Sequence, residues 1–368
     1  MTPFPRESYR PLTPYAPDRR PIELDLSDNT SRWGVHPAAL AALKATAGEP
    51  APEALLRYPA VYADGLRQAV AQRYGVPVEC VATGCGSDDL LDSTFRAAGE
   101  PGEEVRYLPP TFSMVEIFAR MNGMIPTALE RTARLPDLPY GALPHPEALM
   151  EGSPALVYLC RPNNPTGEEF PREWVEAVLE AGGPQGPLIL LDEAYADYSG
   201  SSFLEEAPSI SRLLVLRTLS KVYGLAGLRV GFAVGSPQVI QEVEKSRGPY
   251  KVNRLAEGAA VAALNDAEGW CALRIADAVT ARESLRDALL ARGLAPLPSR
   301  ANFLLLPLAS PQPMPSGSAA AVTAALREQG VAVRPFPDLP GLGDAIRISV
   351  GPPSEMERFL AALDAVLP

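Results

Sequence analysis

The sequence contains few residues of the kinds that bind metals or form disulfide bonds. Its 368 residues include two histidines, His36 and His145, which are too few for a histidine-rich metal site. The four cysteines show none of the short spacings that are typical of zinc sites. We therefore expect neither a metal site nor disulfide bonds. The cysteines are Cys80, Cys85, Cys160 and Cys271.

The sequence also lacks a long hydrophobic run and an excess of basic residues. No uninterrupted apolar stretch approaches the roughly 20 residues that a membrane-spanning helix requires. The first residues, MTPFPRESYRP, have the composition of neither a secretion signal nor a transit peptide. The formal net charge is -11, whereas nucleic acids and anionic membranes attract basic proteins. We expect a cytoplasmic protein that binds small molecules, with neither nucleic acid nor a membrane as partner.

The sequence does contain an alternation of short apolar runs and helical patterns. A clear helical pattern at 172–181 places Trp174, Val175 and Val178 on one face. Strands that alternate with helices predict an α/β fold, with a large domain whose mostly parallel sheet is flanked by helices. The apolar runs that predict buried strands are 155–160, 188–191, 213–216 and 228–234, and further helices are predicted at 36–47 and 63–74.

The pattern changes in the last third of the chain. An alanine-rich helical stretch at 255–292 leads into predicted strands at 302–308 and 345–351. This change predicts a second, smaller α+β domain at the C-terminal end. We expect residues 1–36 to form an N-terminal arm and part of the small domain, residues 37–256 the large domain, and residues 257–368 the small C-terminal domain.

Polar residues follow the predicted strands, at the point where each strand ends. RPNNPTG follows the first apolar run, DEAY the second and RTLSK the third. In open α/β sheets, ligands bind beyond the carboxyl ends of the strands. Upstream, GCGSDD opens a predicted helix whose free N–H groups could hold a phosphate. The sequence therefore predicts a ligand site that is assembled from several strand ends.

Each of these motifs has a simpler explanation when it is taken alone. NNPTG at 163–167 is a good turn sequence, Asp192 could cap a helix, and Lys221 could be a solvated surface lysine. The glycines in 84–86 hint at a dinucleotide-binding fingerprint, but its third glycine and its distal acidic residue are missing. Thr218 and Lys221 have the spacing of a lactamase motif, but the matching downstream motifs are absent. The convergence of the motifs favours one shared ligand.

Pyridoxal phosphate is a ligand that needs all of these groups. Its aldehyde requires a lysine amine, its ring nitrogen requires a carboxylate, and its phenolic oxygen requires hydrogen-bond donors. Its phosphate requires hydroxyl groups, a guanidinium and the start of a helix. The candidates are Lys221 for the aldehyde, Asp192 for the ring nitrogen, and Tyr195 with Asn164 for the phenolic oxygen. The candidates for the phosphate are Ser87 with its neighbour Asp88, Thr218, Ser220 and Arg229.

The sequence resembles the fold-type I pyridoxal-phosphate aminotransferases, and among them it is most similar to the histidinol-phosphate aminotransferase family. The resemblance covers nearly the whole chain. The SK…GLAGLR part of the segment at 217–231 is strongly specific for this fold, whereas NNPTG alone is not. The segments that carry the resemblance are NNPTG (163–167), DEAY (192–195), RTLSKVYGLAGLRVG (217–231), PYKVNRLAE (249–257), SRANFLLL (299–306) and RISVG (347–351).

The resemblance implies roles for residues that the strand ends do not identify. Phe112 would stack on the cofactor ring, and Tyr58 would reach the phosphate of the neighbouring subunit's cofactor, so the active unit would be a homodimer. Arg347 would bind the anionic end of the substrate, and Arg334 would add a second anion contact. Tyr15, on the N-terminal arm, would be a substrate-binding tyrosine, and Asn164 would contact the substrate as well as the cofactor. The simpler alternatives are packing for the aromatic residues, surface exposure for the arginines and disorder for the arm.

The resemblance also implies a reaction, the transfer of an amino group between two substrates that bind in turn. The catalytic residues would be Lys221, Asp192 and Tyr195. Asp192 would keep the ring nitrogen protonated, and the released amine of Lys221 would move the α-proton as a general base. The expected substrates are histidinol phosphate and 2-oxoglutarate, which would give imidazole acetol phosphate and glutamate in histidine biosynthesis.

Two segments depart from the pattern of the family. The family's NENP box is replaced by residues 28–31, Asp-Asn-Thr-Ser, in which Asn29 is a candidate substrate contact, and PYNVN is replaced by PYKVN with Lys251. We expect both segments on the substrate side of the site. The departures leave open an aromatic or broad-range amino acid aminotransferase and a threonine-phosphate decarboxylase. From a different class, a catalytically silent pyridoxal-phosphate-binding protein, such as the sensor half of a regulator, is a further alternative, although no helix-turn-helix extension is apparent.

Overall fold

The computed structural model describes residues 4–14, 16, 18, 20–48, 56–131, 140–266, 269–308 and 318–367. The strands of its largest sheet are β2 (Val81–Cys85), β3 (Glu104–Tyr107), β4 (Ile125–Ala128), β5 (Leu156–Cys160), β6 (Leu188–Asp192), β7 (Leu213–Thr218) and β8 (Val230–Gly235). Among the described residues this sheet has seven strands in the order β2-β8-β7-β6-β5-β3-β4. Only β8 runs against its neighbours, β2 and β7, so the predicted mostly parallel sheet is confirmed.

Helices cover both faces of this sheet, which explains why its central strands are buried throughout and mostly apolar. Every residue of β5, β6 and β7 is buried. Along β6, Ile189 and Leu191 join one hydrophobic cluster, whereas Leu188 and Leu190 join another on the opposite face. The helices of this part of the chain are α1 (Pro37–Gly48), α3 (Asp64–Tyr74), α4 (Ser87–Ala98), α5 (Met114–Met121), α6 (Arg172–Gly182), α7 (Pro237–Ser246) and α8 (Arg254–Leu264).

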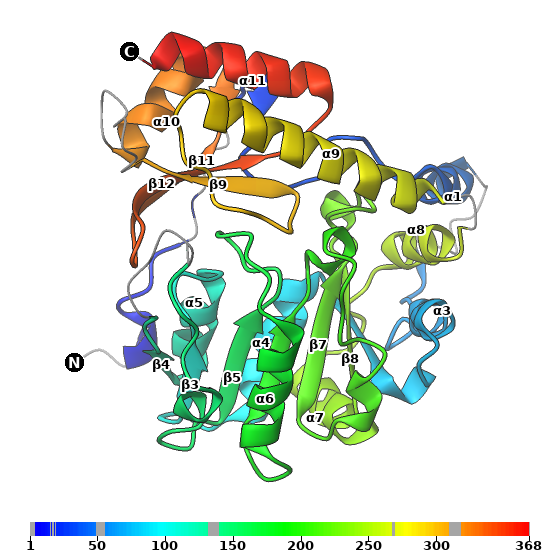
Figure 1. Ribbon diagram of the computed structural model, residues 1–368. Coiled ribbons are helices and arrows are strands. Elements are labelled where there is room, and N and C mark those ends of the chain that lie inside the picture. The colour runs from blue at the N-terminus through cyan, green and yellow to red at the C-terminus, as the bar shows by residue number, and fades with distance from the viewer. Residues whose placement is uncertain are drawn as a thin grey trace.

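A smaller unit stands against one end of the large sheet (Figure 1). Its antiparallel sheet has the order β11-β12-β9 and consists of β9 (Phe303–Pro307), β11 (Arg334–Leu339) and β12 (Gly343–Ser349). Its helices are α9 (Trp270–Ala291), α10 (Ala319–Glu328) and α11 (Pro353–Val366). The predicted helical stretch at 255–292 is therefore two helices, α8 and α9, with residues 265–269 between them.

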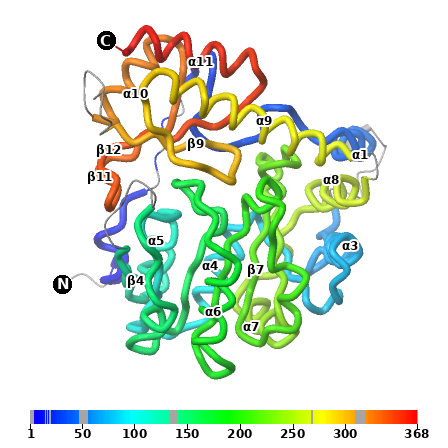
Figure 2. The backbone as a smooth tube through the Cα atoms, viewed as in Figure 1, coloured from blue at the N-terminus to red at the C-terminus, as the bar shows by residue number. Residues whose placement is uncertain are grey.

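The N-terminal segment joins the C-terminal unit. In Figure 2 the blue N-terminal tube runs beside the orange and red C-terminal elements. The short strand β1 (Leu24–Asp25) pairs in parallel with β10 (Val331–Ala332). A boundary at residue 256 would fall inside α8, and the proposed division at residues 36 and 256 stays a prediction.

The sequence analysis did not predict β2, β3 or β4. β2 has the sequence VATGC and β3 has EVRY, so neither presents a continuous apolar run. β4 lies at the edge of the sheet, where none of its four residues is buried. The apolar pattern that identifies a central strand is therefore absent from these three.

The topology brings chemically useful residues to one edge of the large sheet. The carboxyl ends of β2, β5, β6 and β7 meet there, because these strands point the same way. β8 runs in the opposite direction, so its first residues lie at this same edge. This edge therefore brings together the segments that follow the parallel strands and Arg229, the residue that precedes β8.

Candidate active site

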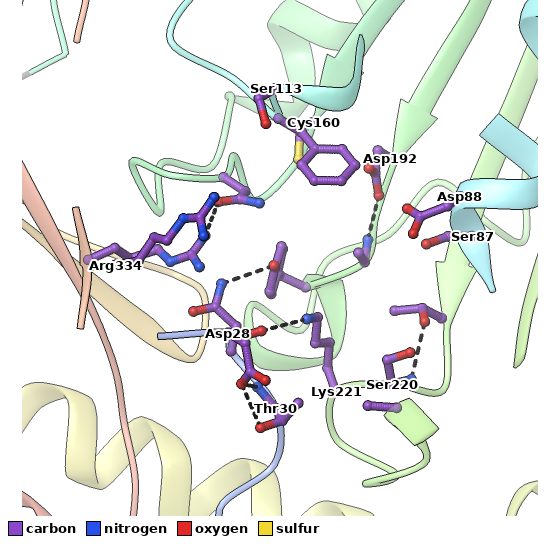
Figure 3. Close-up of a pocket in the computed structure, with 18 of the residues that line it drawn as sticks. Asp28, Thr30, Ser87, Asp88, Ser113, Cys160, Asp192, Ser220, Lys221 and Arg334 are labelled. Atoms are coloured by element: carbon purple, nitrogen blue, oxygen red, sulfur yellow. Dashed lines mark hydrogen bonds between the residues drawn. The ribbon is translucent and has the colours of Figure 1, made fainter. Parts of the chain in front are cut away.

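A cavity of about 500 Å³ lies at this edge of the large sheet. Residues of the N-terminal segment and of the small sheet complete its lining (Figure 3). Tyr58 is not among the lining residues, and Tyr15 lies outside the described part of the chain. The other candidate site residues all line the cavity: Asn29, Ser87, Asp88, Phe112, Asn164, Asp192, Tyr195, Thr218, Ser220, Lys221, Arg229, Arg334 and Arg347.

Lys221 follows the end of β7 and extends into the cavity. Its amine donates a hydrogen bond to the backbone carbonyl of Asp28, 3.4 Å away, and lies 5.4 Å from the centre of the Tyr195 ring. In Figure 3, Lys221 reaches toward Asp28, and Asp192 lies across the cavity from both residues. The amine is thus held beside a carbonyl and an aromatic ring, where it is accessible to a ligand.

Asp192 is a buried carboxylate at the end of β6. Its Oδ2 accepts a hydrogen bond from the Tyr158 hydroxyl at 2.8 Å, and its Oδ1 accepts one from the backbone N–H of Ala194 at 3.0 Å. Burial raises the pKa of Asp192, and these two hydrogen bonds oppose that effect. A buried carboxylate that faces a cavity with neutral donors behind it is suited to a cationic partner, such as a protonated ring nitrogen.

Asn29 connects Tyr195 with the small sheet. Its side-chain nitrogen donates to the Tyr195 hydroxyl oxygen at 3.1 Å, and its Oδ1 accepts from the Ser349 hydroxyl at 3.0 Å. Asn302 donates to the backbone carbonyl of Asn29 at 3.1 Å. These contacts leave the Tyr195 hydroxyl hydrogen available for an acceptor in the cavity. Asn29 therefore lies behind Tyr195, with its polar groups largely directed at protein atoms.

The start of α4 forms another part of the cavity lining. The cap residue Gly86 has a φ of +79°, and no side chain caps the first turn of the helix. A Cβ atom on Gly86 would lie 2.5 Å from Nη2 of Arg229, so only glycine allows the guanidinium this close to the helix start. Ser87 in α4 and the hydroxyl-bearing Thr218 and Ser220 surround the same end. Free amides, hydroxyls and a guanidinium together form a site suited to a phosphate.

Two arginines of the small sheet occupy the remaining side. Arg334 on β11 and Arg347 on β12 are directly opposite each other in the strand register. Arg347 donates to Oδ1 of Asn164 at 2.5 Å and to the carbonyl of Ser27 at 2.8 Å. Its guanidinium also lies 5.5 Å from the centre of the Phe336 ring. Two guanidiniums beside aromatic carbon favour an anionic ligand.

The structure corrects one expectation about the departures from the family pattern. Asp28, Asn29 and Thr30 line the cavity, on the side that Arg347 shares. Lys251, in contrast, forms an ion pair with Asp89 of α4 at 2.8 Å. Its expected position on the substrate side is therefore wrong, because the segment between α7 and α8 runs beside the start of α4.

Sequence reasoning missed Tyr158, the hydroxyl partner of Asp192. Tyr158 lies inside an apolar strand, where its hydroxyl gives no signal of its own. Cys160, two residues later and therefore on the same face of the strand, pairs with Asp192 across β5 and β6. This register could be inferred only after the strand order was known. Thr111, Ser113 and Phe336 also line the cavity and were not predicted.

Two features are absent from the part of the chain that the structure describes. None of its helices has the length and apolar character needed to cross a membrane. No group of three or more His, Cys, Asp or Glu side chains within the described ranges is arranged to hold a metal ion.

Comparison with known proteins places the site in a family. Residues 21–363 match the family model described as aminotransferase class I and II. The histidinol-phosphate aminotransferase of Roseiflexus castenholzii is 38% identical over 98% of this chain and 95% of its own length. The aromatic amino acid aminotransferase of Thermobifida fusca is 36% identical over 97% of this chain and 96% of its own length.

A solved structure agrees with this result. Histidinol-phosphate aminotransferase from Sinorhizobium meliloti, in complex with pyridoxal-5'-phosphate, superposes with a TM-score of 0.79 at 26% identity, covering 94% of this chain and 91% of that one. The family match covers most of the chain, and the relatives match it over nearly their full lengths. The chain belongs to the class I and II aminotransferases.

Proposed function

We propose that this aminotransferase binds pyridoxal phosphate in the cavity and transfers the amino group of histidinol phosphate to 2-oxoglutarate. The observation that carries the proposal is the convergence of the Lys221 amine, the buried Asp192 carboxylate and the start of α4 with Arg229 on one cavity. Pyridoxal phosphate uses all three groups, because its aldehyde takes the amine, its ring nitrogen the carboxylate and its phosphate the helix start.

The residues present fit the cofactor. Lys221 would bind its aldehyde, Asp192 its ring nitrogen, and Tyr195 with Asn164 its phenolic oxygen. Phe112, partly buried in the cavity wall, would stack on its ring. The phosphate would lie against Ser87, Thr218, Ser220 and Arg229. When bound, pyridoxal phosphate supplies an electron-accepting ring that stabilises the charge left when the α-proton departs.

The protein's own residues would direct the reaction from fixed positions. Asp192 would hold a proton on the ring nitrogen, since a buried carboxylate gains stability from a cationic partner. The Lys221 amine would act as the general base that moves the α-proton of the substrate. Tyr195 would donate its hydroxyl hydrogen to the phenolic oxygen, and Asn29, which donates to the Tyr195 hydroxyl, would hold the tyrosine in place.

Arg334 and Arg347 support a phosphorylated amino donor. Two neighbouring guanidiniums can share the three oxygens of a phosphate dianion, and the same pair can bind a carboxylate of 2-oxoglutarate. The name of the Roseiflexus relative points the same way, whereas that of the Thermobifida relative points to aromatic amino acids.

The test is a comparison of kcat/KM for L-histidinol phosphate, L-histidinol, L-phenylalanine and L-tyrosine, with 2-oxoglutarate as acceptor. We expect histidinol phosphate to exceed each of the others by at least about a hundredfold, because the lost contacts are charge-assisted. Phenylalanine or tyrosine as the best donor would overturn the donor assignment and retain the aminotransferase. Carbon dioxide release from L-threonine phosphate, without amino transfer, would identify a decarboxylase instead.

We further propose that the active unit is a homodimer. Tyr58 is 78% exposed, and its ring stacks on that of the 40% exposed Tyr250 at 4.7 Å. Arg254 donates to the backbone carbonyl of Tyr58 at 3.0 Å and holds this segment in place. An ordered, exposed tyrosine that does not line its own cavity is suited to reach the phosphate site of a second copy.

A further inference from the structure

The start of α4 carries two carboxylates where the proposed function places a phosphate. Asp88 and Asp89 both lie in the first turn of the helix. Acidic residues at this position stabilise a helix through its dipole, but they repel another anion bound at the same end. A phosphate site at this helix start therefore requires that both carboxylates be compensated.

A basic residue from a distant part of the chain pairs with each carboxylate. Arg229, which lines the cavity, approaches Asp88 to 3.1 Å. Lys251, in the segment between α7 and α8, approaches Oδ1 of Asp89 to 2.8 Å. The side chain of Lys251 is 30% exposed and that of Asp89 is 12% exposed, so this pair is partly shielded from solvent.

The same aspartate also holds the turn that leads into the helix. Oδ2 of Asp89 accepts the backbone N–H of Cys85 at 3.1 Å, directly before Gly86. The two carboxylate oxygens of Asp89 therefore connect Lys251, on Oδ1, with the backbone N–H of Cys85, on Oδ2. Lys251 is not among the described residues that line the cavity, so it acts on the site only through this aspartate.

We propose that Lys251 is a positioning residue for the cofactor phosphate, in that it neutralises and orients Asp89 beside the start of α4. This inference rests on the proposed function, because it presupposes that the phosphate lies there. Loss of the lysine charge leaves an uncompensated carboxylate next to a dianion.

The experiment measures the dissociation constants of pyridoxal phosphate and of pyridoxal, which lacks the phosphate, for the full-length apoprotein by equilibrium dialysis. We expect Lys251→Met to raise the constant for pyridoxal phosphate about tenfold and to leave that for pyridoxal unchanged. Lys251→Arg should bind like the wild type. The double variant Lys251→Met/Asp89→Asn should recover wild-type affinity, because asparagine removes the charge and retains an acceptor for Cys85.

Lys245→Met is the matched control, since Lys245 forms an ion pair with Glu242 on the exposed face of α7 and its loss changes the net charge equally. Three results would overturn this inference and leave the proposed function standing. They are an equal rise of the two dissociation constants in Lys251→Met, no rise of either constant, and no recovery of pyridoxal phosphate affinity in the double variant. A wild-type protein that fails to bind pyridoxal phosphate would overturn the proposed function together with the inference.

Discussion

Arg347 of the small sheet donates a hydrogen bond from Nη1 to Oδ1 of Asn164, 2.5 Å away, in the loop that follows β5. This contact joins an arginine proposed to bind substrate to an asparagine proposed to bind cofactor. The two residues are 183 positions apart in sequence, and the bond crosses from the small sheet to the large one. One hydrogen bond therefore joins the proposed substrate-binding side of the cavity to the proposed cofactor-binding side.

Replacement of Arg347 should impair substrate binding more than cofactor binding. We expect Arg347→Lys to lower kcat/KM for the amino donor by about 10- to 100-fold, because lysine loses the paired geometry of the guanidinium. The affinity for pyridoxal phosphate should change by less than about threefold, as expected for a side chain outside the phosphate site. Arg212→Lys, at an exposed position with a single backbone contact, is the control for the substitution itself. A loss confined to cofactor affinity would contradict the assigned role.

Replacement of Asp192 should separate activity from stability. We expect Asp192→Asn to lower kcat on the order of 10²- to 10³-fold, because the ring nitrogen loses its anionic partner. Burial raises the pKa of this acid, so its charged form destabilises the folded apoprotein at pH values above the ordinary range of an aspartate. The apoprotein of the variant should therefore be no less stable than the wild type to urea at neutral pH. A decrease in kcat of less than tenfold, or a clear loss of urea stability in the apoprotein of the variant, would contradict this prediction.

The site residues that the apolar pattern predicted share one property, which is that they lie where strong apolar runs end. Asp192 ends the central strand β6, and Asn164 and Lys221 lie in the segments that follow β5 and β7, so the parallel topology brings all three to one edge of the sheet. Lys251 and Asp89 are 162 positions apart, and no sequence pattern pairs their segments, so their contact required the tertiary structure. For the same reason the sequence analysis expected Lys251 on the substrate side, whereas the structure places it beside Asp89 of α4.

The proposed homodimer predicts complementation between two defective variants. Tyr58→Phe should raise the dissociation constant of pyridoxal phosphate about fivefold, through the loss of one hydrogen bond to a charged group. Co-expression of Lys221→Ala with Tyr58→Phe should yield mixed dimers with one intact site and with near-normal cofactor affinity at that site. Tyr62→Phe, at a neighbouring exposed tyrosine, should have no effect. Wild-type cofactor affinity in the Tyr58→Phe variant, expressed without Lys221→Ala, would refute the contact between subunits.

His36 predicts a loss of stability in mild acid. It is buried beside Tyr223 and Trp270, its Nε2 lies 3.2 Å from Asp266, and its backbone N–H donates to Tyr223, two residues after Lys221. Burial lowers the pKa of His36 from 6.5, and the nearby Asp266 opposes this shift. A histidine with a lowered pKa stabilises the folded state above pH 6.5, and that contribution is lost as the pH falls below it.

Urea unfolding of the apoprotein at several pH values between neutrality and mild acid tests the role of His36. The wild type should lose stability across this range, and His36→Gln should lose less, because glutamine does not titrate. His145→Gln is the matched control, since His145 is exposed. Equal pH dependence in the wild type and in His36→Gln would rule out the proposed role.

The most direct measurement of the central claim locates the bond between cofactor and protein. The holoprotein is reduced with borohydride, digested and analysed by mass spectrometry. The account predicts a phosphopyridoxyl group on Lys221 in the wild type and its loss in Lys221→Ala, together with a fall in amino transfer on the order of 10⁴-fold or more. A label on another lysine, or wild-type protein without any label after incubation with pyridoxal phosphate, would contradict it.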